Sequence, residues 1–265
     1  MLLEERSDLL NGGFRRGRRL VKAMAFGWAI GALGPAWAGP PYLSDDPQPT
    51  DLGHWEIYNF AAGSGAPGSL AGEVGLDLNY GAAKDLQLTA VLPLGFESPS
   101  EFSLSGLRAG PDDVELAAKY RFLHQSDGSW MPDVAFFPRL FTPTAERRFG
   151  TGVLGLLVPI WMQKDFGPWS IFGGGGYQIN PGADQRNFWQ GGVAISRSLG
   201  ERLSLGAEVY AQTRATVTGG DSRMVNLAAT YRWTRHWSLL ASAGPAWVNR
   251  SDSGYQFYLA LKADY

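Results

Sequence analysis

The stretch VELAAKYRF, residues 114–122, alternates apolar side chains with polar or small ones. One side of it carries Val114, Leu116, Ala118, Tyr120 and Phe122, and the other side carries Glu115, Ala117, Lys119 and Arg121. Successive side chains of a β-strand point to opposite faces of the sheet, so a period of two is the period of a strand. The stretch therefore predicts a strand with one apolar face and one polar face.

The same pattern returns along the chain after residue 53, and a turn or loop follows each occurrence. Residues 202–212 and 225–233 are clear examples. Taken together, these segments predict an all-β chain of about twelve strands. We expect the strands near residues 54–62, 73–81, 85–95, 112–123, 131–141, 152–163, 168–178, 187–197, 202–213, 222–233, 237–246 and 255–265.

The connections between these segments alternate in length. Short ones are expected at 82–84, 164–167, 199–201 and 234–236, and one of middle length at 124–130. Longer ones are expected at 63–72, 96–111, 142–151, 179–186, 214–221 and 247–254. Short turns at one end and long loops at the other are typical of a transmembrane, antiparallel, up-and-down β-barrel of the bacterial outer membrane. With twelve strands and an N-terminus in the periplasm, we expect the barrel at residues 54–265 to end in the periplasm as well.

A soluble barrel is the alternative, and aromatic residues argue against it. Most of the ten tryptophans fall near the ends of expected strands, where the aromatic girdles of a membrane barrel lie. These are Trp130, Trp161, Trp169, Trp189, Trp233, Trp237 and Trp247. Residues 255–265 also form an alternating strand that ends on Tyr265. We expect outer-membrane lipids to surround the barrel, and the barrel assembly machinery to bind this last strand.

The first 38 residues have the features of a signal peptide. A basic region precedes the apolar stretch 23–33, and the Ala-Trp-Ala sequence at 36–38 fits a cleavage site. The apolar stretch is too short to cross a bilayer as a helix, which takes about 20 residues. We therefore expect export to the periplasm, and a mature chain that begins at Gly39.

Composition excludes several functions. The chain has no cysteine, which removes thiol catalysis, disulfides and cysteine-based metal sites. Its net charge of −2, without a basic stripe, gives no reason to expect a nucleic-acid partner. We also find no cluster with the spacing of metal ligands, and we expect no metal, no cofactor and no catalysis.

In a membrane barrel the apolar face of each strand meets lipid and the polar face lines the lumen. The predicted lumen therefore carries Asp77, Gln87, Glu115, Lys119, Arg121, Arg139, Glu208, Arg232 and Lys262. Their mixed signs argue against strong selection for cations or anions. Either these charges pair across a narrow interior, or they form a constriction that orients a small solute.

Two segments could fill part of that interior. Residues 39–53 are rich in proline and unsuited to a central strand, so they form either a periplasmic tail or a plug in the barrel mouth. In the plug, Asp45 and Asp46 would lie near lumen arginines. The glycines at 173–176 lack the lysine and hydroxyl of a phosphate-binding loop, so they indicate a bend or a close backbone approach. They could leave room for loop 96–111 or for the N-terminal segment.

His236 and Ser238 are spaced as a base and a nucleophile of a hydrolase could be. His236 and Ser238 have the H-x-S spacing of outer-membrane lipid A deacylases, and on a strand two such residues share a face. Our topology puts His236 at a periplasmic turn, on the wrong side for that substrate. An outer-membrane lipid hydrolase is therefore a minor alternative.

The mature sequence resembles a large proteobacterial family of outer-membrane "transporter" proteins, whose label refers to the meta-pathway of phenol degradation. The resemblance rests on PPYLSDDP at 40–47, on HWE at 54–56, on FPRLFTPT at 137–144, on PIWMQKDFGPW at 159–169 and on FGGGGYQINPG at 172–182. It implies an outer-membrane β-barrel that passes small, often aromatic, compounds. It supplies no functional residues to carry over.

These observations predict a narrow passive channel for small molecules, aromatic or hydrophobic ones among them. A barrel that does not transport, and serves as a structural or surface protein, is the main alternative.

Overall fold

A computed structural model of the chain describes residues 40–100, 106–126, 128–146, 148–249 and 252–265. The predicted signal peptide, residues 1–38, lies outside these residues. All regular secondary structure in the described part of the chain is β-strand, and that part contains no helix with the length and apolarity needed to span a membrane.

The strands follow one another with short interruptions. They are β1 (Trp55–Ala66), β2 (Ser69–Ala83), β3 (Leu86–Ser98), β4 (Arg108–Pro111), β5 (Glu115–Leu123), β6 (Asp133–Phe136), β7 (Arg139–Phe141), β8 (Gly155–Phe166), β9 (Trp169–Ile179), β10 (Phe188–Ser198), β11 (Leu203–Gln212), β12 (Ser222–Arg232), β13 (Trp237–Val248) and β14 (Asp252–Asp264). Both β4 and β5 pair with β3, and both β6 and β7 pair with β8. The segments therefore form twelve strands, two of which are interrupted.

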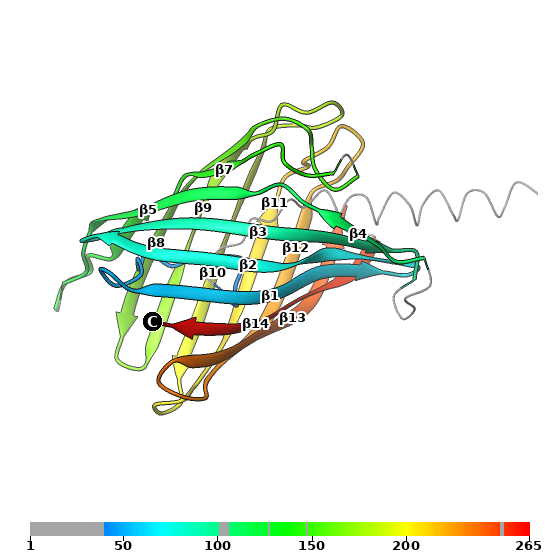
Figure 1. The fold of residues 1–265 in the computed structure, drawn as a ribbon. Coiled ribbons are helices and arrows are strands. Elements are labelled where there is room, and N and C mark those ends of the chain that lie inside the picture. Colours follow the sequence, from blue (N-terminus) through cyan, green and yellow to red (C-terminus); the bar gives the residue numbers. More distant parts are fainter. Residues whose placement is uncertain (1–39, 101–105, 127, 147, 250–251) are drawn as a thin grey trace, which may run out of the picture.

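The sheet closes on itself. Each strand pairs antiparallel with its neighbours in sequence, and β1 pairs with β14 as well as with β2 (Figure 1). Ten residue pairs join β1 to β14, from Glu56 opposite Asp264 to Gly65 opposite Tyr255. Closure removes the unpaired edges that an open sheet would expose. The predicted all-β, antiparallel, up-and-down barrel is confirmed.

We call the end at which β1 begins and β14 ends the terminal end, and the opposite end the loop end. At the terminal end the connections are 84–85, 124–132, 167–168, 199–202 and 233–236. At the loop end they are 67–68, 99–107, 142–154, 180–187, 213–221 and 249–251. Two loops predicted as long, 63–72 and 247–254, are therefore shorter than expected, because the flanking strands continue further: β1 and β2 extend to Ala66 and from Ser69, and β13 and β14 extend to Val248 and from Asp252.

Burial along the strands is the reverse of that in a soluble protein. Large apolar side chains such as Leu92 and Leu227 point outward, and Leu227 is 70% exposed. Polar side chains such as Glu115 and Asn226 point inward, and both are 1% exposed. Charged residues are rarely buried in a water-soluble domain unless they are paired. The arrangement suits an apolar surrounding and a polar interior.

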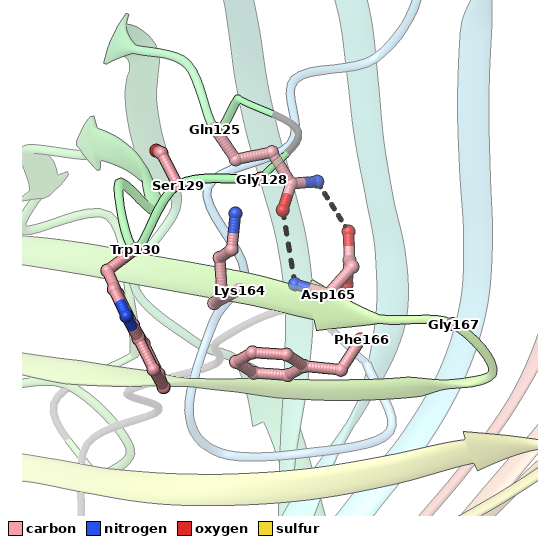
Figure 2. A pocket seen from close by; sticks show the side chains of 8 residues that line it. All are labelled: Gln125, Gly128, Ser129, Trp130, Lys164, Asp165, Phe166 and Gly167. Carbon is pink, nitrogen blue, oxygen red and sulfur yellow. Dashed lines mark hydrogen bonds between the residues drawn. The ribbon is translucent and has the colours of Figure 1, made fainter.

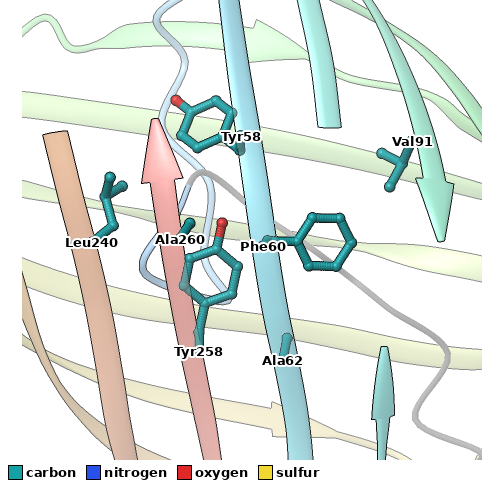
Figure 3. Close-up of a cluster of buried hydrophobic side chains, with 7 residues drawn as sticks. All are labelled: Tyr58, Phe60, Ala62, Val91, Leu240, Tyr258 and Ala260. Carbon is teal, nitrogen blue, oxygen red and sulfur yellow. The ribbon is translucent and has the colours of Figure 1, made fainter. Parts of the chain in front are cut away.

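The interior is not uniformly polar, however. On β1 and β14, Tyr58, Phe60 and Tyr258 form a buried cluster with smaller apolar neighbours (Figure 3). A second cluster contains Trp161, which is 2% exposed. The expectation that Trp161 belongs to an outer girdle is therefore wrong, because Trp161 is one of the alternate residues of β8 whose side chains point inward. Trp130, at 87% exposure, is the opposite case.

Candidate functional site in the barrel interior

The N-terminal segment, residues 40–54, lies against the inward faces of strands from opposite sides of the barrel. Tyr42, Ser44 and Asp45 are all buried there. The segment joins the sheet ladder only by an isolated bridge between Leu52 and Gly81. Beside this bridge, the backbone N–H of Gly53 donates to the Gly81 carbonyl at 2.8 Å, and the Gly81 N–H donates to the His54 carbonyl at 3.0 Å. The hydrogen bonds of the segment to the other strands involve side chains.

The deepest contacts of the segment involve β11 and β13. The backbone N–H of Leu43 donates to a Glu208 oxygen at 3.0 Å, and the N–H of Ser44 donates to the other oxygen. The Asn226 side-chain amide also donates to Glu208, at 2.8 Å. The Ser242 hydroxyl donates to the Pro41 carbonyl at 2.6 Å. Glu208 is thus a buried acceptor for backbone donors that the segment supplies.

An ion pair ties the segment to β5. The Lys119 ammonium lies 2.9 Å from an Asp45 oxygen and 3.9 Å from an Asp46 oxygen. The direct ion-pair partner of these aspartates is thus a lysine rather than an arginine, although Asp45 also lies within electrostatic range of the lumen residue Arg139. Lys119 also lies over the ring of Phe137, 4.9 Å from its centroid.

Nearer the terminal end, Gln48 bridges two charged side chains. Its amide donates to Asp133 at 2.9 Å, and its carbonyl oxygen accepts from the Arg121 guanidinium. Arg121 also donates to Asp85 at 2.8 Å. Burial alone would raise the pKa of Asp85, but hydrogen bonds from Arg121 and the electrostatic effect of the neighbouring His124 hold it below its usual value.

The last contacts of the segment are with an amide network on β2 and β3. The Gln87 carbonyl oxygen accepts from the backbone N–H of Thr50 at 2.9 Å and from its hydroxyl at 3.1 Å. The Gln87 amide then donates to Asn79 and to Thr89. Both the carbonyl oxygen and the amide nitrogen of the Gln87 side chain therefore have hydrogen-bond partners.

A separate ion pair lies further from the terminal end. The Arg139 Nε donates to Glu115 Oε1 at 2.7 Å, and both side chains are buried. Glu115 Oε2, Arg139 Nη1 and Trp161 Nε1 are buried without a hydrogen-bond partner. Asp77 accepts from Asn79 at 2.8 Å and belongs to the same side of the interior. This region holds several polar groups that the protein itself leaves unsatisfied.

Two of the expected lumen residues lie at the rim. Lys262 pairs with Glu56 at 3.1 Å and with Asp264 at 2.9 Å. Arg232 is the last residue of β12; it lies on the same face of the strand as the buried Asn226 and Ala228, but its side chain is exposed at the mouth of the barrel. Its backbone N–H donates to the carbonyl of Arg202, in the connection that precedes β11. The structure thus brings Glu115 together with Arg139, joins Lys119, Arg121, Gln87 and Glu208 through the segment, and leaves Arg232 apart.

Several participants were not among the expected lumen residues, and Asn226, Asp133 and Gln48 show why. Asn226 could have been included, because it alternates with apolar residues at an inward position of 225–233. Asp133 begins an interrupted strand and Gln48 belongs to an irregular segment, so no periodicity marks either one. Only the folded arrangement brings Gln48 and Asp133 together.

The glycine run does not make room for the N-terminal segment. Side chains added at 173–176 would collide with backbone atoms of the neighbouring strands, so these glycines permit close strand approach. The segment is instead accommodated at Gly192, which faces the Ser44 hydroxyl, and at Gly206, which faces the Tyr42 hydroxyl.

The catalytic alternative finds no geometric support. A ring nitrogen of His236 lies 2.9 Å from the Asp264 carbonyl oxygen, and the ring stacks on Tyr265. Ser238 is buried, and no hydrogen bond links it to His236 among the described residues. Within the same residues, no three His, Asp or Glu side chains converge to hold a metal ion.

A shallow pocket of about 410 Å³ lies outside the interior, at the rim of the terminal end (Figure 2). Trp130 and Phe166 meet there edge to face, with centroids 6.2 Å apart. Beside them the Lys164 ammonium donates to two backbone carbonyls, and Gln125 bonds Asp165 twice. The polar groups of this pocket serve to fix loop 124–132.

Comparison with solved structures gives likenesses in fold. The chain superposes on an outer membrane channel from Pseudomonas putida F1 with a TM-score of 0.65 and 15% identity, covering 83% of this chain and 98% of that one. It superposes on the NanC porin with a TM-score of 0.52 and 7% identity, covering 79% of this chain and 98% of that one. No protein-family model and no curated protein matches the sequence. The resemblance stated above is therefore confirmed for the outer-membrane barrel fold, and not for the phenol-pathway label.

Proposed function

We propose that the protein is a passive outer-membrane channel for small solutes, aromatic ones among them, and that residues 40–52 close its lumen. The terminal end then faces the periplasm. The outward apolar side chains, the polar interior and the fold shared with outer-membrane channels support this proposal. The buried aromatic clusters on the inner wall favour aromatic solutes, since they offer ring contacts along the path.

The observation that carries the proposal is the way the segment is held. It contacts β3, β5, β6, β11 and β13 through side chains rather than through a continuous ladder. Each neutral hydrogen bond contributes about 1 kcal/mol and a charged one somewhat more. The segment can therefore leave without breaking the barrel, which is what a reversible closure requires.

The test is conductance of the refolded full-length mature chain in planar lipid bilayers. We expect the chain lacking residues 40–50 to give larger single-channel steps than the intact chain, because the deletion removes the obstruction. Folding of both is verified first by heat-modifiable gel mobility.

A charge exchange provides the matched control. Lys119→Glu places a second acid opposite Asp45 and should release the segment, raising conductance. Lys119→Glu combined with Asp45→Lys restores the opposite charges and should return conductance to the level of the intact chain. If folded barrels remain silent in every variant, the proposal is wrong and the protein is a structural or surface barrel.

A further inference from the structure

Tyr42 fills a ring-sized depression on the inner wall. Its side chain is 9% exposed and packs edge to face on Phe172, with ring centroids 5.0 Å apart and planes at 80°. Ala194 and Ala228 complete the same buried cluster. Edge-to-face packing is a favoured arrangement for two aromatic rings. The segment thus carries one ring into a pocket whose other walls belong to the barrel.

The pocket exists because three consecutive strands, β10, β11 and β12, present small residues beside Phe172 of β9. In the register of the sheet, Phe172 of β9 lies opposite Ala194 of β10, and Gly206 of β11 lies opposite Ala228 of β12. A Cβ atom on Gly206 would collide with the Tyr42 hydroxyl. We call Phe172, Ala194, Gly206 and Ala228 the ring pocket. Its floor is open because Ala194, Gly206 and Ala228 have small side chains or none, and Phe172 supplies the aromatic contact.

Glu208 gives the ring pocket a polar side. It lies opposite Ala194 in the register, and among the described residues it has no ion-pair partner. Two of its three donors are backbone N–H groups of Leu43 and Ser44, which depart when the segment departs. A buried carboxylate that loses its donors costs free energy, so a solute with an O–H or N–H group can replace them.

The charge of the ligand follows from the same contacts. Burial, and then the nearby Glu208 carboxylate, raise the pKa of Tyr42 to about 12, so the hydroxyl in the pocket is neutral at neutral pH. An anionic ring would face Glu208 without a cation to compensate. The pocket therefore favours a neutral phenol or aniline over a benzoate.

We propose that the ring pocket binds a neutral aromatic solute carrying a hydrogen-bond donor, and that Tyr42 is its tethered competitor. The inference rests on the proposed function, because a solute reaches the pocket only in a barrel that admits it. A group tethered within the same chain competes at an effective concentration on the order of millimolar. Solute binding and closure by the segment then exclude one another.

The experiment measures binding of 4-fluorophenol by fluorine NMR to the refolded mature chain in detergent micelles. We expect Tyr42→Ala to bind at least about ten-fold more tightly than the intact chain, because the tethered ring is gone. Tyr42→Phe keeps the ring and should behave as the intact chain does. Gln48→Ala loosens the segment elsewhere and should stay closer to the intact chain than Tyr42→Ala.

A second pair of measurements locates the binding. Tyr42→Ala combined with Ala228→Leu refills the pocket and should lose the gained affinity, and 4-fluorobenzoate should not bind to Tyr42→Ala. Equal affinity in the intact chain and Tyr42→Ala, or gained affinity that survives Ala228→Leu, would overturn the inference. Conductance is measured separately. If deleting residues 40–50 opens the channel but no solute binds the ring pocket, the proposed function stands and this inference is wrong. If the solute binds but the barrel conducts no current, only the proposed function is refuted.

Discussion

Inside the barrel, the Glu115–Arg139 pair puts two charges where little solvent reaches them. Glu115 is 1% exposed and Arg139 is 2% exposed, and one polar atom of each is unsatisfied. Burying both ions carries a desolvation cost that their attraction only partly returns. Arg139 also lies over the Phe137 ring at 5.3 Å from its centroid, which adds to the attraction on one face of the guanidinium.

Removing one member of this pair should therefore be worse than removing both. We expect Arg139→Met to lower the free energy of unfolding by about 3–5 kcal/mol, since Glu115 is left as an uncompensated buried acid. Arg139→Met combined with Glu115→Leu should recover most of that loss. Urea unfolding in detergent, followed by tryptophan fluorescence, measures both. A double variant no more stable than the single one would contradict this view of the pair.

For single residues, the sequence predicts which face of the sheet a side chain takes, but not which residue it pairs with. Alternation in residues 114–122 was enough to assign Glu115, Lys119 and Arg121 to the inward face. It could not pair Lys119 with Asp45, because that contact depends on how a segment without periodicity lies in the folded barrel. The ring pocket could not be predicted for a similar reason: most of it is formed by glycine and alanine, whose small side chains do not show an alternation of apolar and polar residues.

Among the elements, strands that alternate strongly were located within a few residues, and weakly alternating ends were missed. Residues 63–72 consist mostly of glycine, alanine and serine, so their two faces differ little in polarity. They nevertheless pair as far as Ala66 opposite Ser69, and Pro67-Gly68 closes the hairpin. Proline followed by glycine suits a type II turn, and Gly68 has the positive φ of 84° that this turn needs.

That turn offers a clean test of backbone conformation. A Cβ at Gly68 would meet no atom within 4 Å, so Gly68→Ala changes the backbone preference without a collision. We expect it to lower the free energy of unfolding by about 1–2 kcal/mol, whereas Gly68→Asn should cost less, because asparagine tolerates this φ. Urea unfolding of the two variants compares them. Equal losses would indicate that the turn residue acts through something other than its φ.

Over the whole molecule, the alternation of apolar and polar residues along each strand produces both the apolar exterior and the polar interior of the barrel. The same period of two that turns Leu227 outward turns Asn226 inward, and repetition over twelve closed strands yields an apolar exterior and a polar interior. Closure also decides what the N-terminal segment can do. With no free strand edge to join, it is held mainly by side chains of the inner wall, and its backbone bonds to the sheet at Gly81 of β2, beside the Leu52 bridge.

The proposed orientation of the barrel can be tested directly, because the chain has no cysteine of its own. Val217→Cys, in an exposed part of the loop end, and Thr234→Cys, in a turn of the terminal end, each introduce a single thiol. On intact Gram-negative cells, a membrane-impermeant maleimide should label the thiol at 217 and leave that at 234 unlabelled. Permeabilising the outer membrane should expose the second thiol, because the terminal end then becomes accessible from the periplasm. Labelling at 234 on intact cells would mean that the barrel is inserted the other way round, and that the segment closes it from the cell surface.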